Sequence, residues 1–192
     1  MSTTFDRAMT WLMRKDVEAG YYDGTGAHDV NPTLDGVTQN TYDAYRRGIG
    51  KAKRVVKDMT PEERDSIYRL LYWTKGKCEA ISQKSETIAI IHFDACVNHG
   101  VATPNSDKSS GAIELLQRAL GVEDDGLFGP ITWQNLVSEL MEDGEEKLAL
   151  RYFKVREAQY RHLAKIAPNT LGLNLKGWLA RLDRLKKHLR FP

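Results

Sequence analysis

Residues 85–100 have the sequence SETIAIIHFDACVNHG, and this stretch decides the fold. From Ser85 to Asn98 the side chains are apolar on nearly every side of a helix, which is typical of a helix buried on all faces. The triplet Asn98-His99-Gly100 ends this helix. We therefore expect a buried central helix around which the rest of the chain packs.

The segments on both sides of this helix predict a mainly α fold. Thr60, Pro61 and Glu63 supply an N-cap, a first-turn proline and a capping box for a helix that runs to about Trp73. Residues 20–35 contain many Gly, Asp, Asn and Tyr residues, and they predict a small hairpin or irregular β region. Loops are expected over 76–82 and 103–108, and helices over 3–17, 38–49, 110–120, 130–141, 145–167 and 175–189.

The composition is that of a soluble globular protein, with 41% hydrophobic and 28% charged residues in a chain of 192. No segment approaches the roughly 18 uninterrupted apolar residues of a membrane span. Residues 1–16 lack the apolar core and the cleavage site of a signal peptide, which favours synthesis in the cytosol. Cys78 and Cys96 predict two reduced, partly buried thiols rather than a disulfide framework or a metal site.

The net charge of +2 conceals an uneven distribution of charge. Residues 145–192 carry twelve Lys or Arg residues against four Asp or Glu residues, so the rest of the chain is acidic. A basic C-terminal region favours a polyanionic partner such as nucleic acid, anionic lipid or an acidic wall polymer. We expect the last helix to pack through its leucines. Its basic face, which includes Arg181 and Arg184, is expected to be solvated and attracted to anionic envelope polymers.

Glu18 is the main candidate for chemistry. It lies at the end of the first predicted helix, where the helix dipole disfavours a negative charge. Apolar groups around the carboxyl group would favour its protonated form further. A glutamic acid that stays protonated beside a polar cleft is the central part of a glycosidase, whereas an exposed glutamate at a helix end is the ordinary alternative.

Four patches of the sequence, in this order, resemble one family. The first is Glu18-Ala19-Gly20-Tyr21 together with NPTLDGVT at 31–38, and the second is DACVNHG at 94–100. The third, within 112–135, contains LQRALG and DGLFGPIT, and the fourth is Tyr152, Arg156 and Tyr160 with GWLAR at 177–181. Together they resemble glycoside hydrolase family 108, which contains phage endolysins, with its associated predicted peptidoglycan-binding region.

The first patch departs from the family pattern at two places. Ala19 stands where the family has Gly, and Asn31-Pro32 stands where the family has a pair of glycines before the threonine. The loop from Glu18 to Thr33 is also one residue longer. The aspartate of the family's loop can therefore match His28 or Asp29, and residue type favours Asp29.

The resemblance implies an α+β, lysozyme-like fold. A catalytic region is expected over residues 1–100 and a helical, peptidoglycan-binding-like region over 101–192, packed together as one globular unit. The implied activity is that of an endolysin, which hydrolyses the β-1,4 bond between N-acetylmuramic acid and N-acetylglucosamine in peptidoglycan and so lyses the host cell. No cofactor or metal is expected.

The resemblance also implies roles for individual residues. Glu18 is expected to be the general acid and Asp29 the second catalytic carboxylate, with Asp35 as an alternative, and the hydroxyl of Thr33 is expected to hold water. The residues expected to contact the substrate are Tyr21, Tyr22, Asp35, Asn98 and His99.

Two other functions stay open at this point. A lytic transglycosylase would cleave the same bond with one glutamate and without water. A non-catalytic peptidoglycan-binding or phage structural module is compatible with the departures at Ala19 and Asn31-Pro32. Nucleic acid is not expected as a partner, because no base-reading motif accompanies the basic charge. The protein is expected to be a monomer made in the host cytoplasm, which reaches the periplasm through a separate pore-forming protein.

Overall fold

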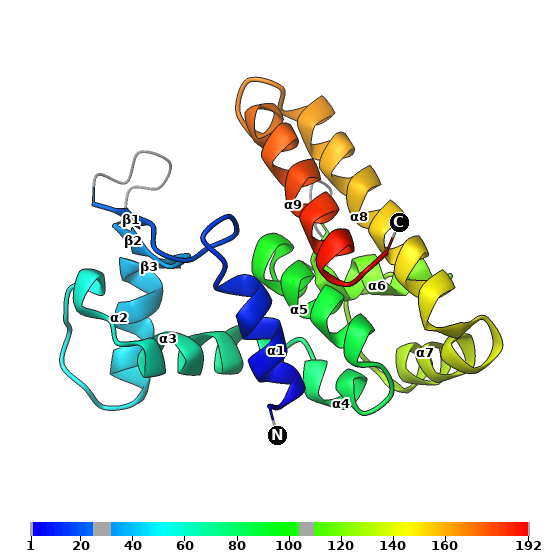
Figure 1. The fold of residues 1–192 in the computed structure, drawn as a ribbon, viewed down its shortest axis with the longest axis horizontal. Helices are drawn as coiled ribbons and strands as arrows, with labels where there is room; N and C mark the ends of the chain where they lie inside the picture. The colour runs from blue at the N-terminus through cyan, green and yellow to red at the C-terminus, as the bar shows by residue number, and fades with distance from the viewer. Residues whose placement is uncertain (1, 25–31, 104–109, 192) are drawn as a thin grey trace.

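The structure of the chain is a computed structural model, which describes residues 2–24, 32–103 and 110–191. Within these ranges the chain is mainly helical (Figure 1). The α-helices are α1 (Thr4–Leu12), α2 (Gln39–Gly48), α3 (Pro61–Tyr68), α4 (Cys78–Ser82), α5 (Glu86–His99), α6 (Ala112–Leu120), α7 (Pro130–Glu142), α8 (Gly144–Ile166) and α9 (Leu175–His188). The strands are β1 (Tyr22–Asp23), β2 (Thr33–Leu34) and β3 (Val37–Thr38).

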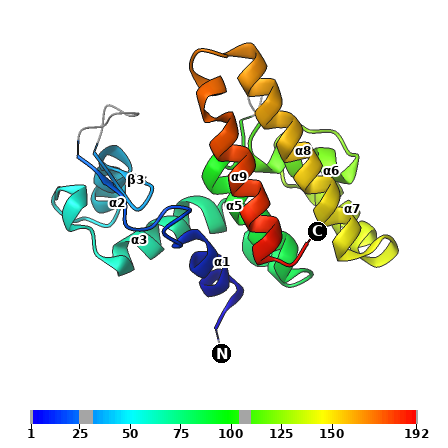
Figure 2. The ribbon, with the colours of Figure 1, turned by 45° about the horizontal axis from the view of Figure 1, so that its top comes forward.

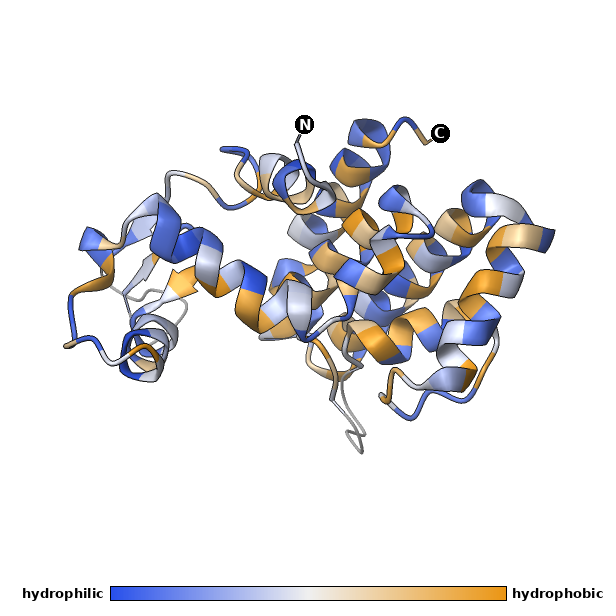
Figure 3. Cartoon of the chain, turned by 90° about the horizontal axis from the view of Figure 1, so that it is seen from below, coloured by the Kyte–Doolittle hydropathy of each residue, from blue (hydrophilic) through white to orange (hydrophobic). Residues whose placement is uncertain are grey.

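Helix α5 is the centre of the core, as the sequence predicts. Every residue from Ile88 to Cys96 is buried, and α1, α4, α6 and α8 all pack against the helix. Figure 3 shows that hydrophobic residues gather in this helical part of the molecule, whereas hydrophilic residues predominate around the sheet and α2. Among the described residues, no helix combines the length and the apolar character needed to cross a bilayer.

One apolar core extends through both of the regions expected from the sequence. It contains Leu12 of α1, Ile91 of α5, Leu116 of α6, Phe153 of α8 and Leu185 of α9. The expected division of the chain near residue 100 falls at the end of α5, and it stays a prediction.

The β region is a three-stranded antiparallel sheet in the order β1-β2-β3. Tyr22 lies opposite Leu34, and Thr33 lies opposite Thr38. Asp35 and Gly36 form the turn between β2 and β3 with φ angles of 48° and 76°. The predicted hairpin is thus confirmed, with a third strand added to it. The sheet, α2 and α3 form one end of the molecule in both ribbon views (Figures 1 and 2).

The capping signals predict the start of α3 correctly. The hydroxyl of Thr60 accepts a hydrogen bond from the backbone N–H of Glu63, and the Glu63 carboxylate accepts one from the N–H of Thr60. The helix then continues as a π-helical segment, Arg69–Thr74, to the predicted end near Trp73.

Two predictions from the sequence are wrong, namely the end of the first helix and the loop over 76–82. Helix α1 ends at Leu12 rather than near residue 17, because the apolar spacing stops there and the exposed side chains of Arg14 and Asp16 bond to each other instead. The expected loop over 76–82 contains α4. This short helix packs against α5 through Cys78 and Ile81, which are three residues apart and fully buried. Two apolar residues at this spacing are too short a pattern to predict a helix from the sequence.

Candidate active site

Glu18 lies in a turn that follows α1 rather than in the last turn of the helix. The carbonyl oxygen of Arg14 accepts hydrogen bonds from the backbone N–H groups of Val17, Glu18 and Ala19, at 2.9, 3.2 and 3.1 Å. The helix-dipole environment expected for Glu18 is therefore wrong. Instead of a helix end, a charged side chain, that of Arg181, contacts the Glu18 carboxyl group.

The Glu18 carboxylate is paired with an arginine from the other end of the chain. Oε1 of Glu18 lies 2.6 Å from Nη1 of Arg181 on α9, and the Glu18 side chain keeps 20% of its surface exposed. Arg181 is buried, with 7% exposure, so it is not part of the solvated basic face expected from the sequence. Its guanidinium therefore fixes the orientation of the Glu18 carboxyl group.

Arg181 is held in turn by Asp94 of the central helix. Nε and Nη2 of Arg181 lie 3.0 and 2.9 Å from Oδ1 of Asp94, which is fully buried. Asp94 also accepts hydrogen bonds from Nε1 of Trp11 at 2.9 Å and from Nη2 of Arg156 at 2.6 Å. The four ionised side chains of Glu18, Asp94, Arg156 and Arg181 sum to zero charge, which limits the cost of burying them.

The charges in this network shift the pKa values of Asp94 and Arg181. Burial alone would raise the pKa of Asp94, but the charges of Arg181 and Arg156 hold it well below its ordinary value. Burial alone would lower the pKa of Arg181, but Asp94 and Glu18 raise it. Asp94 and Arg181 therefore stay ionised across the physiological range and form a rigid charged support for Glu18.

The second carboxylate oxygen of Glu18 faces the turn of the sheet. A Cβ atom at Gly36 would lie 2.8 Å from Oε2 of Glu18 and 2.5 Å from the hydroxyl of Tyr68. Gly36, with its positive φ, therefore allows the backbone to pass close to the carboxylate. The Tyr68 hydroxyl donates a hydrogen bond to the carbonyl oxygen of Asp35 at 2.8 Å, which fixes this turn against α3.

A surface cavity of ≈ 330 Å³ opens beside Glu18. It is lined by residues 15–19, Tyr21, Thr33 and Gly36, so the structure brings Glu18, Tyr21 and Thr33 together as neighbours. The ring of Tyr21 is 63% exposed and offers an open aromatic face. The cavity combines a carboxyl group, an aromatic ring and a hydroxyl, the groups expected to contact a sugar.

The other residues predicted near the sheet have different surroundings. The Asp35 carboxylate accepts a hydrogen bond from the backbone N–H of Gly20 at 2.7 Å and pairs with Arg64 at 3.2 Å, so it fastens the turn after Glu18. Tyr22 is exposed, and Nζ of Lys57 lies 5.6 Å from the centre of its ring. Asp29 and His28 lie outside the described residues.

Asn98 and His99 do not line the Glu18 cavity. The Tyr160 hydroxyl donates a hydrogen bond to Oδ1 of Asn98. The His99 ring stacks on Tyr160 with centroids 4.5 Å apart, and Tyr160 stacks on Trp178 at 5.0 Å. Both predicted substrate contacts are thus engaged with α8 and α9.

Sequence reasoning missed four residues of the site. It assigned no role to Asp94 and Arg156 and placed Arg181 on a solvated basic face. All three fall in the patches that resemble the family, and this was the signal that could have found them. Asp16 was also missed. Its carboxylate lines the cavity and bonds to Arg14 at 2.9 Å, and that bond lowers its pKa.

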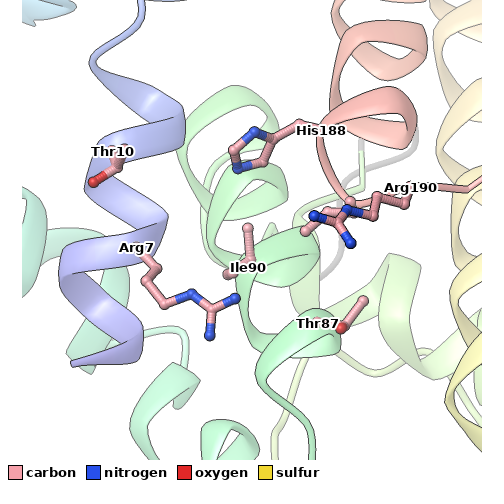
Figure 4. A pocket seen from close by; sticks show the side chains of 7 residues that line it. Arg7, Thr10, Thr87, Ile90, His188 and Arg190 are labelled. Carbon is pink, nitrogen blue, oxygen red and sulfur yellow. The ribbon is translucent and has the colours of Figure 1, made fainter. Parts of the chain in front are cut away.

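A larger cavity, of ≈ 480 Å³, lies between α1, α5 and the C-terminal end of α9 (Figure 4). Arg7, His188 and Arg190 give its rim a basic character, and Thr10 and Thr87 add hydroxyls. Glu18 does not line it. None of the described residues that line this larger cavity carries a carboxylate.

The comparisons with known proteins divide the chain into two parts. Residues 15–100 match the family described as Glycosyl hydrolase 108, and residues 111–183 match the family described as Predicted Peptidoglycan domain. No curated protein matches the chain. The solved structure of Brucella abortus SagA is similar in fold, with a TM-score of 0.71 and 23% identity over 98% of this chain and 95% of that chain. The chain therefore joins a glycosyl hydrolase 108 region, residues 15–100, to a predicted peptidoglycan domain, residues 111–183.

Proposed function

We propose that the chain hydrolyses the β-1,4 bond between N-acetylmuramic acid and N-acetylglucosamine, with Glu18 as the general acid. The coarser assignment, a glycoside hydrolase that acts on peptidoglycan, follows from the two matched families. The observation that carries the finer proposal is the placement of the Glu18 carboxyl group between Arg181 and an open cavity that also exposes Tyr21 and Thr33.

The two oxygens of Glu18 suit different tasks in this mechanism. Arg181 holds Oε1 at 2.6 Å, and because Asp94 keeps Arg181 in place, the carboxyl group has a fixed orientation. Oε2 lies beside Gly36, which has no side chain of its own, and near the Tyr68 hydroxyl. We assign to Oε2 the proton that is delivered to the leaving oxygen of the sugar. The ion pair between Arg181 and Asp94 does not depend on Glu18.

The remaining cavity residues suit binding and water placement. The exposed ring of Tyr21 can stack on the apolar face of a sugar, and the Thr33 hydroxyl is close enough to the cavity to hold a water molecule. Asp29 is proposed as the second carboxylate because of the family resemblance. Asp16 is the other carboxylate, among the described residues, that lines the same cavity with Glu18.

The variant Glu18→Gln tests the proposal. It keeps the shape of the side chain and a hydrogen-bond acceptor for Arg181 but cannot deliver a proton, so hydrolysis should fall by about 10²–10⁴-fold. The assay is the release of reducing ends from purified peptidoglycan, with mass spectrometry of the products. Glu123→Gln, an exposed glutamate remote from the cavity lining, is the matched control and should keep full activity.

The same assay separates the alternatives. Products that end in anhydro-muramic acid would identify a lytic transglycosylase instead of a hydrolase. Peptidoglycan that is bound but not cleaved by the unmodified protein would identify a non-catalytic module. A Glu18→Gln protein as active as the control would show that another group is the acid.

We also propose a phage endolysin made in the host cytoplasm and released to the periplasm by a separate pore-forming protein. The basic cavity of Figure 4 and the exposed lysines of α9 support an attraction to anionic envelope polymers. Expression in a bacterium with and without a pore-forming protein tests the release, since lysis should require the pore. Lysis without a pore would contradict this part of the proposal.

A further inference from the structure

A cluster of soft donor atoms lies on the face of α5 that points away from Asp94. His92 and Cys96 are four residues apart and so share one face of the helix. Cys78 begins α4, which packs on α5. One nitrogen of His92 and the two Sγ atoms all lie within 4.8 Å of one another, and the three side chains are fully buried.

Both ring nitrogens of His92 have partners within hydrogen-bonding distance. Nδ1 lies 2.8 Å from the hydroxyl of Tyr152, which itself lies 3.0 Å from the carbonyl oxygen of Ala112. Nε2 faces the carbonyl oxygen of Gly76 at 3.0 Å. A carbonyl oxygen only accepts, so the point between it and Nε2 suits a proton or a metal ion.

The backbone also approaches the cluster closely. A Cβ atom at Gly76 would lie 2.5 Å from Sγ of Cys96 and 3.3 Å from Sγ of Cys78. Only a residue without a side chain lets this turn pass over the two sulfur atoms. The Gly76 carbonyl oxygen lies 3.0 Å from Nε2 of His92, one of the three side-chain donors.

We propose that Cys78, His92 and Cys96 bind one zinc ion, with the carbonyl oxygen of Gly76 as the fourth donor. Thiolate and imidazole are the ligands that zinc prefers in structural sites. Two thiolates and a neutral imidazole around Zn²⁺ have no net charge, so a fully buried site tolerates them. Binding displaces one proton from each thiol and the proton on Nε2, while Tyr152 continues to orient the ring through Nδ1.

The arrangement needs little movement to accept the ion. Zinc–sulfur and zinc–nitrogen bonds of about 2.3 and 2.0 Å imply donor separations of roughly 3.3–3.8 Å in a tetrahedral site, so side-chain shifts of about 1 Å close the cluster. The ion would fasten α4 and the turn at Gly76 to α5. Because Asp94 is on the opposite side of the same helix, zinc would stabilise the helix that supports the Arg181–Glu18 pair.

The direct test uses the full chain, purified without a polyhistidine tag. Elemental analysis after dialysis should find about one zinc per chain. Cobalt(II) added to the chelator-treated protein should give thiolate-to-cobalt charge-transfer absorption and the intense visible bands of a tetrahedral site. A hundredfold excess of zinc over its Kd should raise the melting temperature by about 5–10 °C.

His92→Gln and Cys78→Ser should lose the cobalt spectrum and the retained zinc, whereas His162→Gln, on the exposed surface of α8, should keep both. If the two cluster variants fail to fold, the cobalt titration of the unmodified chain still decides the question. Two free thiols with no metal uptake would overturn the proposal. A disulfide between Cys78 and Cys96 in the freshly purified protein would overturn it as well. None of these measurements depends on peptidoglycan hydrolysis.

Discussion

The two faces of α5 contain different chemistry within the same buried helix. One face presents Asp94, which accepts hydrogen bonds from Trp11, Arg156 and Arg181. Arg181 also pairs with Glu18, so this face carries a network of charged groups. The other face presents His92 and Cys96, which form a compact group of soft donors with Cys78. The first face connects the two ends of the chain, whereas the second connects neighbouring helices. A single apolar helix thus supports a candidate catalytic carboxyl group and, independently, a candidate metal site.

Removal of the charge on the first face should have the largest effect on stability. Asp94→Ala leaves Arg156 and Arg181 buried without their partner, which should lower the free energy of unfolding by about 3–5 kcal/mol. Cys78→Ala, which faces this second side of α5 from α4, should cost only about 1–2 kcal/mol in chelator-treated protein, because burial raises the pKa of the Cys78 thiol and no charge is stranded. Urea unfolding measures both values. Equal losses would contradict the distinction between the two faces.

A change at the Glu18 end of the network should have an intermediate effect. Gly36→Ala places a Cβ 2.8 Å from Oε2 of Glu18 at a φ of +76°, so it should cost about 1–3 kcal/mol of stability and also displace the carboxyl group. Hydrolysis should fall more than stability alone explains, because the acid is moved. Gly48→Ala, in α2 with nothing within 4 Å of the added carbon, is the control and should be neutral or slightly stabilising. Normal hydrolysis by Gly36→Ala would show that Oε2 is not the reacting oxygen.

The smallest effect should appear at the end of α5. Burial lowers the pKa of His99 well below its ordinary value, and the charge of Arg156 lowers it further, while Asp94 opposes the shift. The unfolded chain, with an ordinary His pKa near about 6.5, therefore binds a proton before the folded chain does. The stability that depends on a neutral His99 should be fully present above about pH 6.5 and should fall as the pH decreases below that value.

His99→Gln should flatten this pH dependence between about pH 7 and pH 5, as measured by urea unfolding at each pH. The exposed His162 is the matched position, and His162→Gln should leave the slope unchanged. An unchanged slope in His99→Gln would mean that His99 titrates alike in the folded and unfolded chain.

Much of the fold could be predicted from local patterns. The all-round apolar sequence of α5, the Thr60–Glu63 capping box and the glycine- and aspartate-rich segment before β2 each act over a few residues, and each prediction is confirmed. The errors occurred where the local signal was short. Helix α1 stops after Leu12, and α4 exists because Cys78 and Ile81 find a surface on α5.

The candidate site could be predicted only in part. Glu18, Tyr21 and Thr33 belong to one stretch of sequence that the family resemblance covers, and the structure places them on one cavity. Arg181 was expected on a solvated helix face, since a basic amphipathic pattern does not reveal which of its charges is buried. The structure places it between Asp94 and Glu18.

The sequence by itself determined the helical character of the chain, its buried central helix, its small sheet and its candidate acid, because periodicity, capping and turn formation depend on neighbouring residues. Only the tertiary structure decided what holds that acid and what else α5 supports. The bond from Arg181 to Glu18 spans 163 positions in the chain, and the Cys78–His92–Cys96 group forms only when α4 packs on α5. Contacts of this kind depend on how helices pack, and no local pattern records them.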